Sequence, residues 1–224
     1  MHVQVVLFDG FDPLDAIAPF EVLHAGGTAS DGSITVELVS AEGPREVVSG
    51  TGDLTLRAIA AFDPTRAGLV LVPGAAGLVG DPQEQPSDED TAGEYIQVRL
   101  ARTLDTALPA LLKDAMENPD ITVTTVCGGS LVLAMAGLTE GRHATTHHLG
   151  MDLLEATGTH AVRARIVDDG DLVTAAGVTS GLDLGLYLLE REIGPQVAHA
   201  VEELFAHERR GVVWRNAGPA PSSF

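Results

Sequence analysis

The sequence predicts an α/β protein in which a mostly parallel sheet lies between helices on both of its faces. Short runs of β-branched and other apolar residues at 3–8, 68–73 and 121–126 are typical of parallel strands that are buried on both sides. These runs alternate along the chain with segments that have helical apolar periodicity. Strands that alternate with helices imply one sheet covered by helices on both faces.

The first helix is expected to begin near Ala18 and to carry Pro19 in its first turn, where a missing N–H group costs nothing. Gly26 and Gly27 are expected to end it. The remaining elements are predicted in chain order: a strand at 33–41, a hairpin at 45–58, a strand and glycine-rich turn at 68–77, a helix broken near Pro109 within 94–119, a strand at 121–126, helices at 129–138 and 147–158, a hairpin at 161–177, and helices at 180–194 and 195–208.

The length of 224 residues and the hydrophobic content of 45% allow one full core, so we expect a single domain over residues 1–224. Residues 80–93 form an acidic stretch rich in proline and glycine, and an amphipathic segment follows it. The stretch is expected to be a surface loop. The domain is thus predicted to carry an extra acidic loop and helix at about 80–107.

The formal charge of −19 comes from 32 acidic and 13 basic residues, and such a surface repels nucleic-acid phosphates and anionic lipids. We therefore predict no nucleic-acid partner and no membrane partner. No apolar run reaches the roughly 20 residues of a membrane span, and the first residues do not have the pattern of a secretory signal. A cytoplasmic protein is expected. A single cysteine excludes an internal disulfide and a metal cluster of several thiolates.

Ligands of open parallel sheets bind at the carboxyl ends of the strands. Four loops are expected to converge at this edge, with the sequences FDGFDPLDAIAP, VPGAAG, VCGGS and AAGVTSG. The second loop lacks a G-x-G-x-x-G continuation and the lysine of a phosphate-binding loop, so nucleotide binding is poorly supported. A small-molecule site is predicted where these loops meet.

Cys127 follows a buried strand directly and is followed by Gly128 and Gly129. This is the layout of a nucleophile elbow, in which a strained turn projects a reactive side chain. The N-terminus of the next helix would favour the thiolate. A small apolar residue that fills the core is the alternative, and the spacing alone leaves both interpretations open.

Asp15, in the first of these loops, has two interpretations. It either caps the following helix or acts as a carboxyl group beside the thiol, where burial would raise its pKa and let it move protons. His147 and His148 follow Cys127 in the chain, and an imidazole could accept the thiol proton. The simpler explanation is that these histidines open a helix. The other histidines have no metal-ligand spacing, so no metal is predicted.

Backbone groups complete the predicted site. Gly74, Ala75 and Gly128 are expected to offer amides as oxyanion-type donors or to orient the substrate. The segment GVTSGLD brings Val178 and Thr179 to the same edge, and these two residues and His147 are expected to bind the substrate. Thr179 or Ser180 is expected to cap the helix that follows.

The segments LDAIAP, VPGAAG, TVCGGSLVLAMAGLTEGRHATTHH and GVTSGLDLGLYL together resemble the DJ-1/PfpI superfamily, and within it the isocyanide hydratases. The resemblance spans most of the chain. It implies a flavodoxin-like α/β sandwich, a homodimer, and no cofactor. It also implies hydration of an isocyanide to an N-substituted formamide, with Cys127 as the nucleophile, Asp15 as the general acid and base, and a covalent thioimidate intermediate.

The sequence departs from this family pattern at two places. The hydratases carry threonine directly after the cysteine and the PfpI-type peptidases carry histidine, whereas this chain has Gly128. The segment between Pro73 and Cys127 is also longer than in the hydratases, and the extra length is expected to be a lid, a dimer element or an addition without a role.

Two other functions stay open. A glyoxalase or deglycase would use the same thiol and carboxyl group on a reactive carbonyl such as methylglyoxal, although those enzymes typically carry glutamate where this chain has Asp15. A non-enzymatic small-molecule sensor is the other alternative, because AraC-type regulators carry a similar domain. No basic domain follows in this sequence, and this disfavours a regulator that binds DNA itself.

Overall fold

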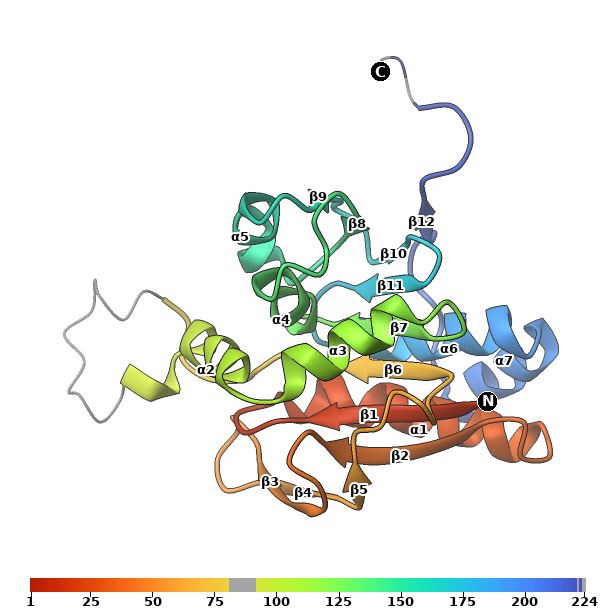
Figure 1. The fold of residues 1–224 in the computed structure, drawn as a ribbon. Helices are drawn as coiled ribbons and strands as arrows, with labels where there is room; N and C mark the ends of the chain where they lie inside the picture. The colour runs from red at the N-terminus through yellow and green to blue at the C-terminus, as the bar shows by residue number, and fades with distance from the viewer. Residues whose placement is uncertain (81–91, 221, 223–224) are drawn as a thin grey trace.

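A computed structural model describes residues 1–80, 92–220 and 222 of the chain. In this part of the chain an eight-stranded sheet has the order β12-β10-β11-β7-β6-β1-β2-β5, and its strands are parallel except for the antiparallel pair β10 and β11 (Figure 1). Its strands are β1 (His2–Leu7), β2 (Thr35–Ser40), β5 (Ala60–Ala61), β6 (Leu69–Val72), β7 (Thr122–Val126), β10 (Ile166–Asp168), β11 (Leu172–Ala175) and β12 (Trp214–Arg215).

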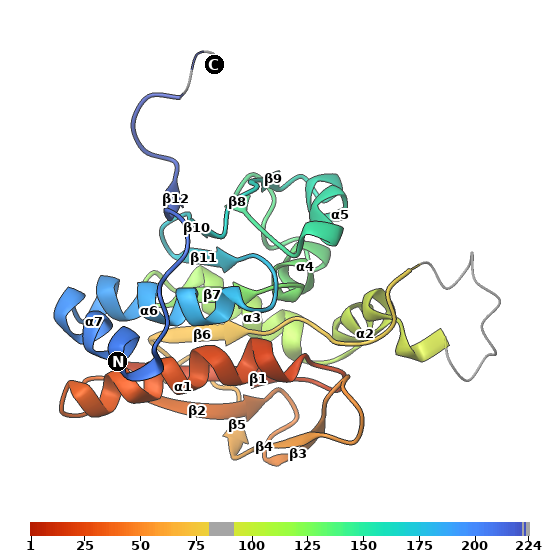
Figure 2. The ribbon, with the colours of Figure 1, turned by 180° about the vertical axis from the view of Figure 1, so that it is seen from behind.

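Helices cover both faces of the sheet. α1, α6 and α7 lie on one face and α3 and α4 on the other, as the two opposite views show (Figures 1 and 2). The α-helices are α1 (Pro13–Ala29), α2 (Ile96–Arg102), α3 (Leu108–Glu117), α4 (Gly129–Met135), α5 (Met151–Ala156), α6 (Ser180–Glu192) and α7 (Pro195–Phe205). The predicted three-layer, flavodoxin-like sandwich is confirmed.

Two small sheets lie outside the main one. β3 (Arg45–Val48) and β4 (Thr55–Ala58) form the hairpin predicted at 45–58, and β8 (His143–Ala144) pairs in parallel with β9 (His160–Ala161). The predicted hairpin at 161–177 is the antiparallel pair β10 and β11.

The expected bounds of the first helix are wrong. α1 begins at Pro13, because the side chain of Asp12 caps it by accepting a hydrogen bond of 2.9 Å from the Leu14 amide. Pro19 therefore lies inside the helix and not in its first turn. The helix also continues through Gly26 to Ala29, so the glycine pair does not end it.

The glycine at position 26 serves the packing of α1 against α6. A Cβ atom at Gly26 would lie 2.1 Å from Cδ2 of Leu189, and one at Gly185 would lie 2.8 Å from Val22. A Cβ atom at Gly181 would lie 3.0 Å from Pro19. Glycines on both helices thus allow their backbones to approach closely.

The segment before β7 is helical and interrupted, as predicted. α2 is followed by the 3₁₀ helix η2 (Thr103–Asp105), and α3 then begins with Pro109 in its first turn. A short 3₁₀ helix, η1 (Ala92–Glu94), precedes α2. The predicted acidic loop falls largely on residues 81–91, which lie outside the described residues.

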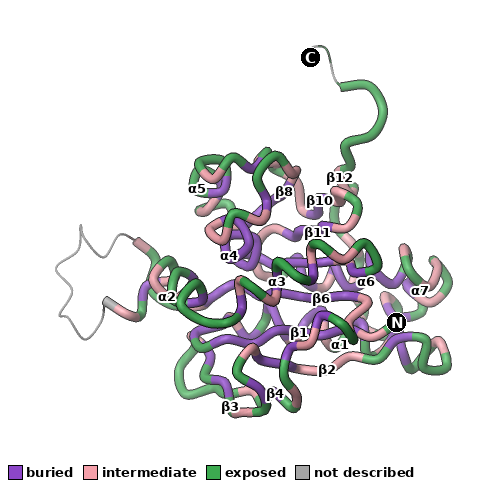
Figure 3. The backbone as a smooth tube through the Cα atoms, in the orientation of Figure 1, coloured by how far each residue is buried: buried purple, intermediate pink, exposed green. Residues whose placement is uncertain are grey.

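Burial is concentrated in the central strands β1, β6 and β7 and in the helix surfaces that face them (Figure 3). Leu69, Val70, Leu71 and Val72 of β6 are all fully buried, as the continuous apolar run predicted. Among the described residues, no helix has both the length and the apolar character that a membrane crossing requires.

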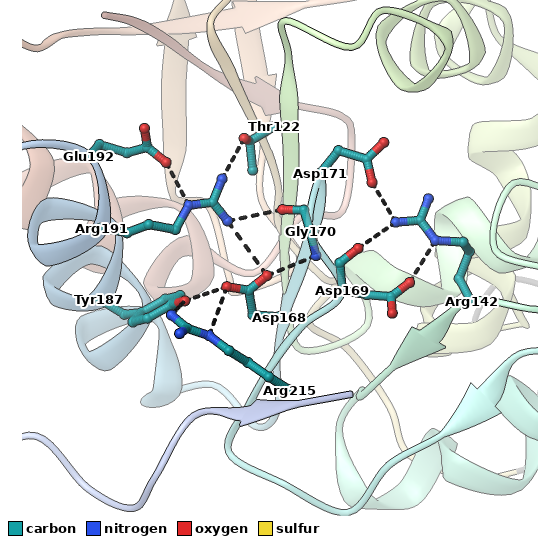
Figure 4. A network of polar contacts seen from close by, with 10 residues as sticks. All are labelled: Thr122, Arg142, Asp168, Asp169, Gly170, Asp171, Tyr187, Arg191, Glu192 and Arg215. Atoms are coloured by element: carbon teal, nitrogen blue, oxygen red, sulfur yellow. Dashed lines mark hydrogen bonds and ion pairs between the residues drawn. The ribbon is translucent and has the colours of Figure 1, made fainter. Parts of the chain in front are cut away.

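The turn between β10 and β11 holds the edge of the sheet together through a polar network (Figure 4). Asp168 accepts hydrogen bonds from the Tyr187 hydroxyl and, at 2.8 Å, from the Gly170 amide. It also forms ion pairs with Arg191 of α6 at 3.7 Å and with Arg215 of β12 at 3.3 Å. The turn therefore joins α6 and the C-terminal strand to the sheet.

Candidate active site

The loops that follow β1, β6, β7 and β11 meet at one edge of the sheet, as the rule for parallel sheets predicts. The loop after β1 is bonded to the loop after β6, since the Asp12 amide donates to the Gly74 carbonyl at 2.8 Å. The loop after β11 is bonded to the end of β7, since the Cys127 amide donates to the carbonyl groups of Ala175 and Ala176 at 3.0 and 2.8 Å.

Cys127 has the strained backbone of a nucleophile elbow. Its φ angle is +56°, which a non-glycine residue adopts only at a cost. Gly129 permits the turn, because a Cβ atom there would lie 2.1 Å from the Val72 carbonyl oxygen. A cysteine that only filled the core would not require this conformation, so the backbone favours the elbow over the core interpretation.

Two buried hydroxyl groups hold the carbonyl group of this elbow. Thr146 donates a hydrogen bond of 2.9 Å to the Cys127 carbonyl oxygen, and Ser130 donates one of 3.2 Å. Neither residue was predicted from the sequence. The sequence offers one indication for Thr146, which lies directly before His147 and His148. A threonine in a polar segment has many other uses, however, so this position alone does not predict the contact.

Asp15 lies in the first turn of α1 and is fully buried. Its Oδ2 atom accepts a hydrogen bond of 2.9 Å from the Gly74 amide. Its Oδ1 atom is buried and makes no hydrogen bond of normal geometry with the described residues, although the Cys127 thiol lies beside the carboxyl group and interacts with it. Asp12 caps the helix, so the capping role considered for Asp15 is wrong.

Burial raises the pKa of Asp15 well above its ordinary value, and the charge of Asp12 adds to this shift. Burial also raises the pKa of Cys127, as does the charge of Asp15, and the hydrogen bond from the Gly128 amide opposes these effects only in part. The amide at the helix N-terminus lowers the pKa of the thiol, as expected, but burial and the charge of Asp15 outweigh it. Because one negative charge in this pair disfavours a second, the pair retains at least one proton at neutral pH.

A pocket of about 330 Å³ opens over the thiol. Much of its wall is apolar and comes from α2, α4, the 3₁₀ helix η3 (His148–Gly150) and the loop after β11. The apolar side chains of the wall include Ile96, Leu100, Leu131, Met135, Leu149 and Val178. Cys127 is only 7% exposed, and this small exposed surface faces the pocket.

The structure places four predicted binding residues around this pocket, namely Ala75, Gly128, His147 and Val178. Two others lie elsewhere. The Gly74 amide is bonded to Asp15 and is not available to a substrate. Thr179 lies outside the described pocket lining, where its hydroxyl accepts a hydrogen bond of 3.3 Å from Arg165.

The cap predicted for the helix after this loop is only partly correct. Thr179 occupies the N-cap position of α6, but its side chain makes no capping hydrogen bond. The Ser180 hydroxyl instead donates a hydrogen bond of 2.6 Å back to the Gly177 carbonyl.

The two histidines lie at the start of η3 and line different cavities. His147 lines the pocket, and its Nδ1 atom accepts a hydrogen bond of 3.3 Å from the Leu149 amide, which leaves Nε2 as the donor of the neutral ring. Burial, together with the neighbouring His148, lowers the pKa of His147. His148 faces a different cavity. Among the described residues, no group of three or more potential metal ligands lies together.

The residues of α2 that line the pocket were missed. Ile96, Gln97 and Leu100 belong to the segment that the sequence marked as an amphipathic addition. The apolar periodicity of this segment predicted a buried face, but nothing in the sequence indicated that this face lies over the thiol.

Residues 99–191 match the model of the DJ-1/PfpI family. The chain is also 34% identical over 203 residues to the isonitrile hydratase of Pseudomonas putida, an alignment that covers 90% of this chain and 76% of that protein. The chain belongs to the DJ-1/PfpI family.

Two further relatives extend the comparison. A THiJ/PfpI family protein from Pseudomonas syringae has a solved structure that superposes with a TM-score of 0.73 at 25% identity, covering 97% of this chain and 78% of that one. The HTH-type transcriptional regulator CdhR of Pseudomonas aeruginosa is 36% identical over 101 residues, which are 43% of this chain and 30% of the regulator.

Proposed function

We propose that this protein is a cofactor-independent hydratase that converts isocyanides, R–N≡C, to N-substituted formamides, R–NH–CHO. The observation that carries the proposal is the buried pair of Asp15 and Cys127 at the base of an apolar pocket. The similarity to an isonitrile hydratase over most of both chains supports the same chemistry.

The first step forms the thioimidate. The carboxylate of Asp15 accepts the thiol proton while the sulfur of Cys127 attacks the terminal carbon of the isocyanide. The carboxyl group then returns this proton to the same carbon, which gives R–N=CH–S–Cys. The raised pKa of Asp15 suits this exchange, because a carboxyl group that binds a proton readily can act as both base and acid.

Water completes the reaction. The water oxygen adds to the thioimidate carbon. Asp15 accepts one proton of this water and passes it to the nitrogen, and the product is R–NH–CH(OH)–S–Cys. The carbon–sulfur bond then breaks, the hydroxyl proton returns to the sulfur through Asp15, and R–NH–CHO leaves. In this proposal the amide of Ala75 and the Nε2 donor of His147 orient the water and the substrate nitrogen, and the Gly128 amide stabilises the sulfur.

A sensor role is the second candidate, because part of the chain is similar to a transcriptional regulator. In that case the pocket would bind a small molecule without turnover. A glyoxalase or deglycase would use the same pair on a carbonyl compound. The proposal further includes a homodimer in the cytoplasm, for which size-exclusion chromatography with light scattering is the direct test of the oligomeric state.

The decisive experiment incubates the purified chain with cyclohexyl isocyanide and 4-nitrophenyl isocyanide and follows formamide production by mass spectrometry, with methylglyoxal in parallel. Turnover of isocyanides that is lost in Cys127→Ala and Asp15→Asn is expected. Asp53→Asn, which removes an exposed carboxyl group elsewhere, serves as the matched control. Binding of isocyanide without formamide would favour the sensor, and turnover of methylglyoxal alone would favour the glyoxalase.

A further inference from the structure

The space that a side chain at position 128 would occupy is filled by a residue from another helix. A Cβ atom at Gly128 would lie 3.1 Å from Cδ1 of Leu100 and 3.6 Å from its Cδ2 atom. Leu100 comes from α2 and is 2% exposed. Its methyl groups therefore occupy the space beside the thiol that a side chain at position 128 would enter.

The electrostatics of the pocket disfavour an anion. Asp12 is the charged residue of the described lining, which contains no lysine or arginine, and the carboxyl group of Asp15 lies behind the thiol. His147 does not compensate, because its lowered pKa leaves its ring neutral at neutral pH. A carboxylate on the substrate would lose its hydration here without gaining a cationic partner.

The pocket volume is that of a site for one small molecule. About 330 Å³ lies near the lower end of the roughly 300–1,000 Å³ found for small-molecule sites. The pocket wall includes apolar side chains such as Ile96, Leu131 and Leu149, and covering them with apolar substrate surface is favourable.

We infer that the pocket selects isocyanides with neutral, apolar substituents of cyclohexyl or aryl size, and that Leu100 is the residue that limits this size. The inference rests on the proposed function for its substrate class. The geometric basis is the contact between Leu100 and the site of the missing side chain at Gly128.

The first test measures kcat/KM of the purified protein for three substrates: cyclohexyl isocyanide, methyl isocyanoacetate and the isocyanoacetate anion. The ester and the anion share a skeleton and differ in charge. We expect kcat/KM for the anion to be at least about tenfold below that for the ester, and the cyclohexyl compound to be the best of the three. Equal kcat/KM values for the ester and the anion would overturn the inference.

The second test concerns size. Leu100→Ala should raise kcat/KM for 2-naphthyl isocyanide relative to cyclohexyl isocyanide by about tenfold or more. Leu104→Ala, on the neighbouring η2 and 38% exposed, is the matched control and should leave this ratio unchanged. A role of Leu100 in folding alone would lower both rates together, and an unchanged ratio would exclude Leu100 as the size-limiting residue.

A double-variant cycle tests the contact itself. Gly128 has φ −68°, so alanine fits its backbone, and the added methyl group would crowd Leu100. Gly128→Ala should therefore reduce kcat/KM for cyclohexyl isocyanide, and Leu100→Ala in the same chain should restore part of the loss. Additive losses in the double variant would contradict the contact.

A fourth measurement does not depend on hydratase activity. Cys127 is the only thiol, so intact-mass spectrometry reports its alkylation without background. Relative to N-acetylcysteine, we expect neutral iodoacetamide to be favoured over anionic iodoacetate by about tenfold or more. If no isocyanide is hydrated, the proposed function fails while this ratio still tests the charge preference. A ratio equal to that of N-acetylcysteine would overturn the preference.

Discussion

Asp15 at the start of α1 and Cys127 directly after β7 form a buried pair, in which burial and the carboxylate charge both raise the pKa of the thiol. The Gly74 amide fixes one carboxylate oxygen, and the other is free to exchange a proton. This relationship, more than the reactivity of either group alone, characterises the candidate site.

Asp15→Asn should stabilise the fold, and increasingly so as the pH rises. The folded pKa of Asp15 is raised by burial, so the folded chain binds a proton more tightly than the unfolded chain does. The stabilising effect of this proton is complete below the unfolded pKa of about 3.9 and is lost as the pH rises through the folded pKa. Thermal unfolding from pH 5 to 8 measures the difference, and a constant difference would contradict the buried, raised-pKa carboxyl group.

The alkylation of Cys127 should have a midpoint above the roughly 8.5 of free cysteine. Burial and the charge of Asp15 both raise the pKa of the thiol. Asp15→Asn removes the charge and should lower the midpoint, whereas Asp53→Asn should not change it. Rates of reaction with iodoacetamide between pH 6 and 10 provide the measurement. A wild-type midpoint below that of free cysteine would contradict the raised pKa of the Cys127 thiol.

Thr146→Val should weaken the elbow. It removes a hydrogen bond to the Cys127 carbonyl and should cost about 1–3 kcal/mol of unfolding free energy. Thr124→Val is the matched control, because its buried hydroxyl donates to the Val70 carbonyl at 3.0 Å. Denaturant unfolding should show similar losses for both variants, while only Thr146→Val should change the alkylation rate of Cys127. Equal alkylation rates in the two variants would show that Thr146 does not position the elbow.

Gly129→Ala should destabilise the fold by several kcal/mol or prevent folding, because its Cβ atom would lie 2.1 Å from the Val72 carbonyl oxygen. Gly177→Ala is the matched control, since its Cβ atom would lie 3.4 Å from the His147 ring, an ordinary contact. Urea unfolding of both variants tests this, and equal stabilities would contradict the close approach of the elbow to β6.

The sequence alone predicts the layers, because buried parallel strands have continuous apolar runs that do not depend on distant contacts. It also predicts the edge of the sheet that carries Cys127 and Asp15. The start of α1 was misplaced because the Asp12–Pro13 signal competed with Pro19, and tertiary packing carried the helix past Gly26.

The pocket wall and the protonation of the pair could not be predicted in the same way. The position of Leu100 depends on how α2 packs on α4, which local periodicity does not specify. The pKa of Cys127 depends on the balance between burial, the Asp15 charge and the Gly128 amide, and the sequence indicated only the last type of contribution, through the helix N-terminus.

The glycines between α1 and α6 affect the position of Asp15 as well as the packing of the two helices. Because α1 carries Asp15 at one end, a side chain added at Gly26 or Gly185 would push the whole helix and move the carboxyl group away from the thiol. Loss-of-function substitutions in this protein are therefore expected in two places, at the turn that carries Cys127 and at the glycines between α1 and α6.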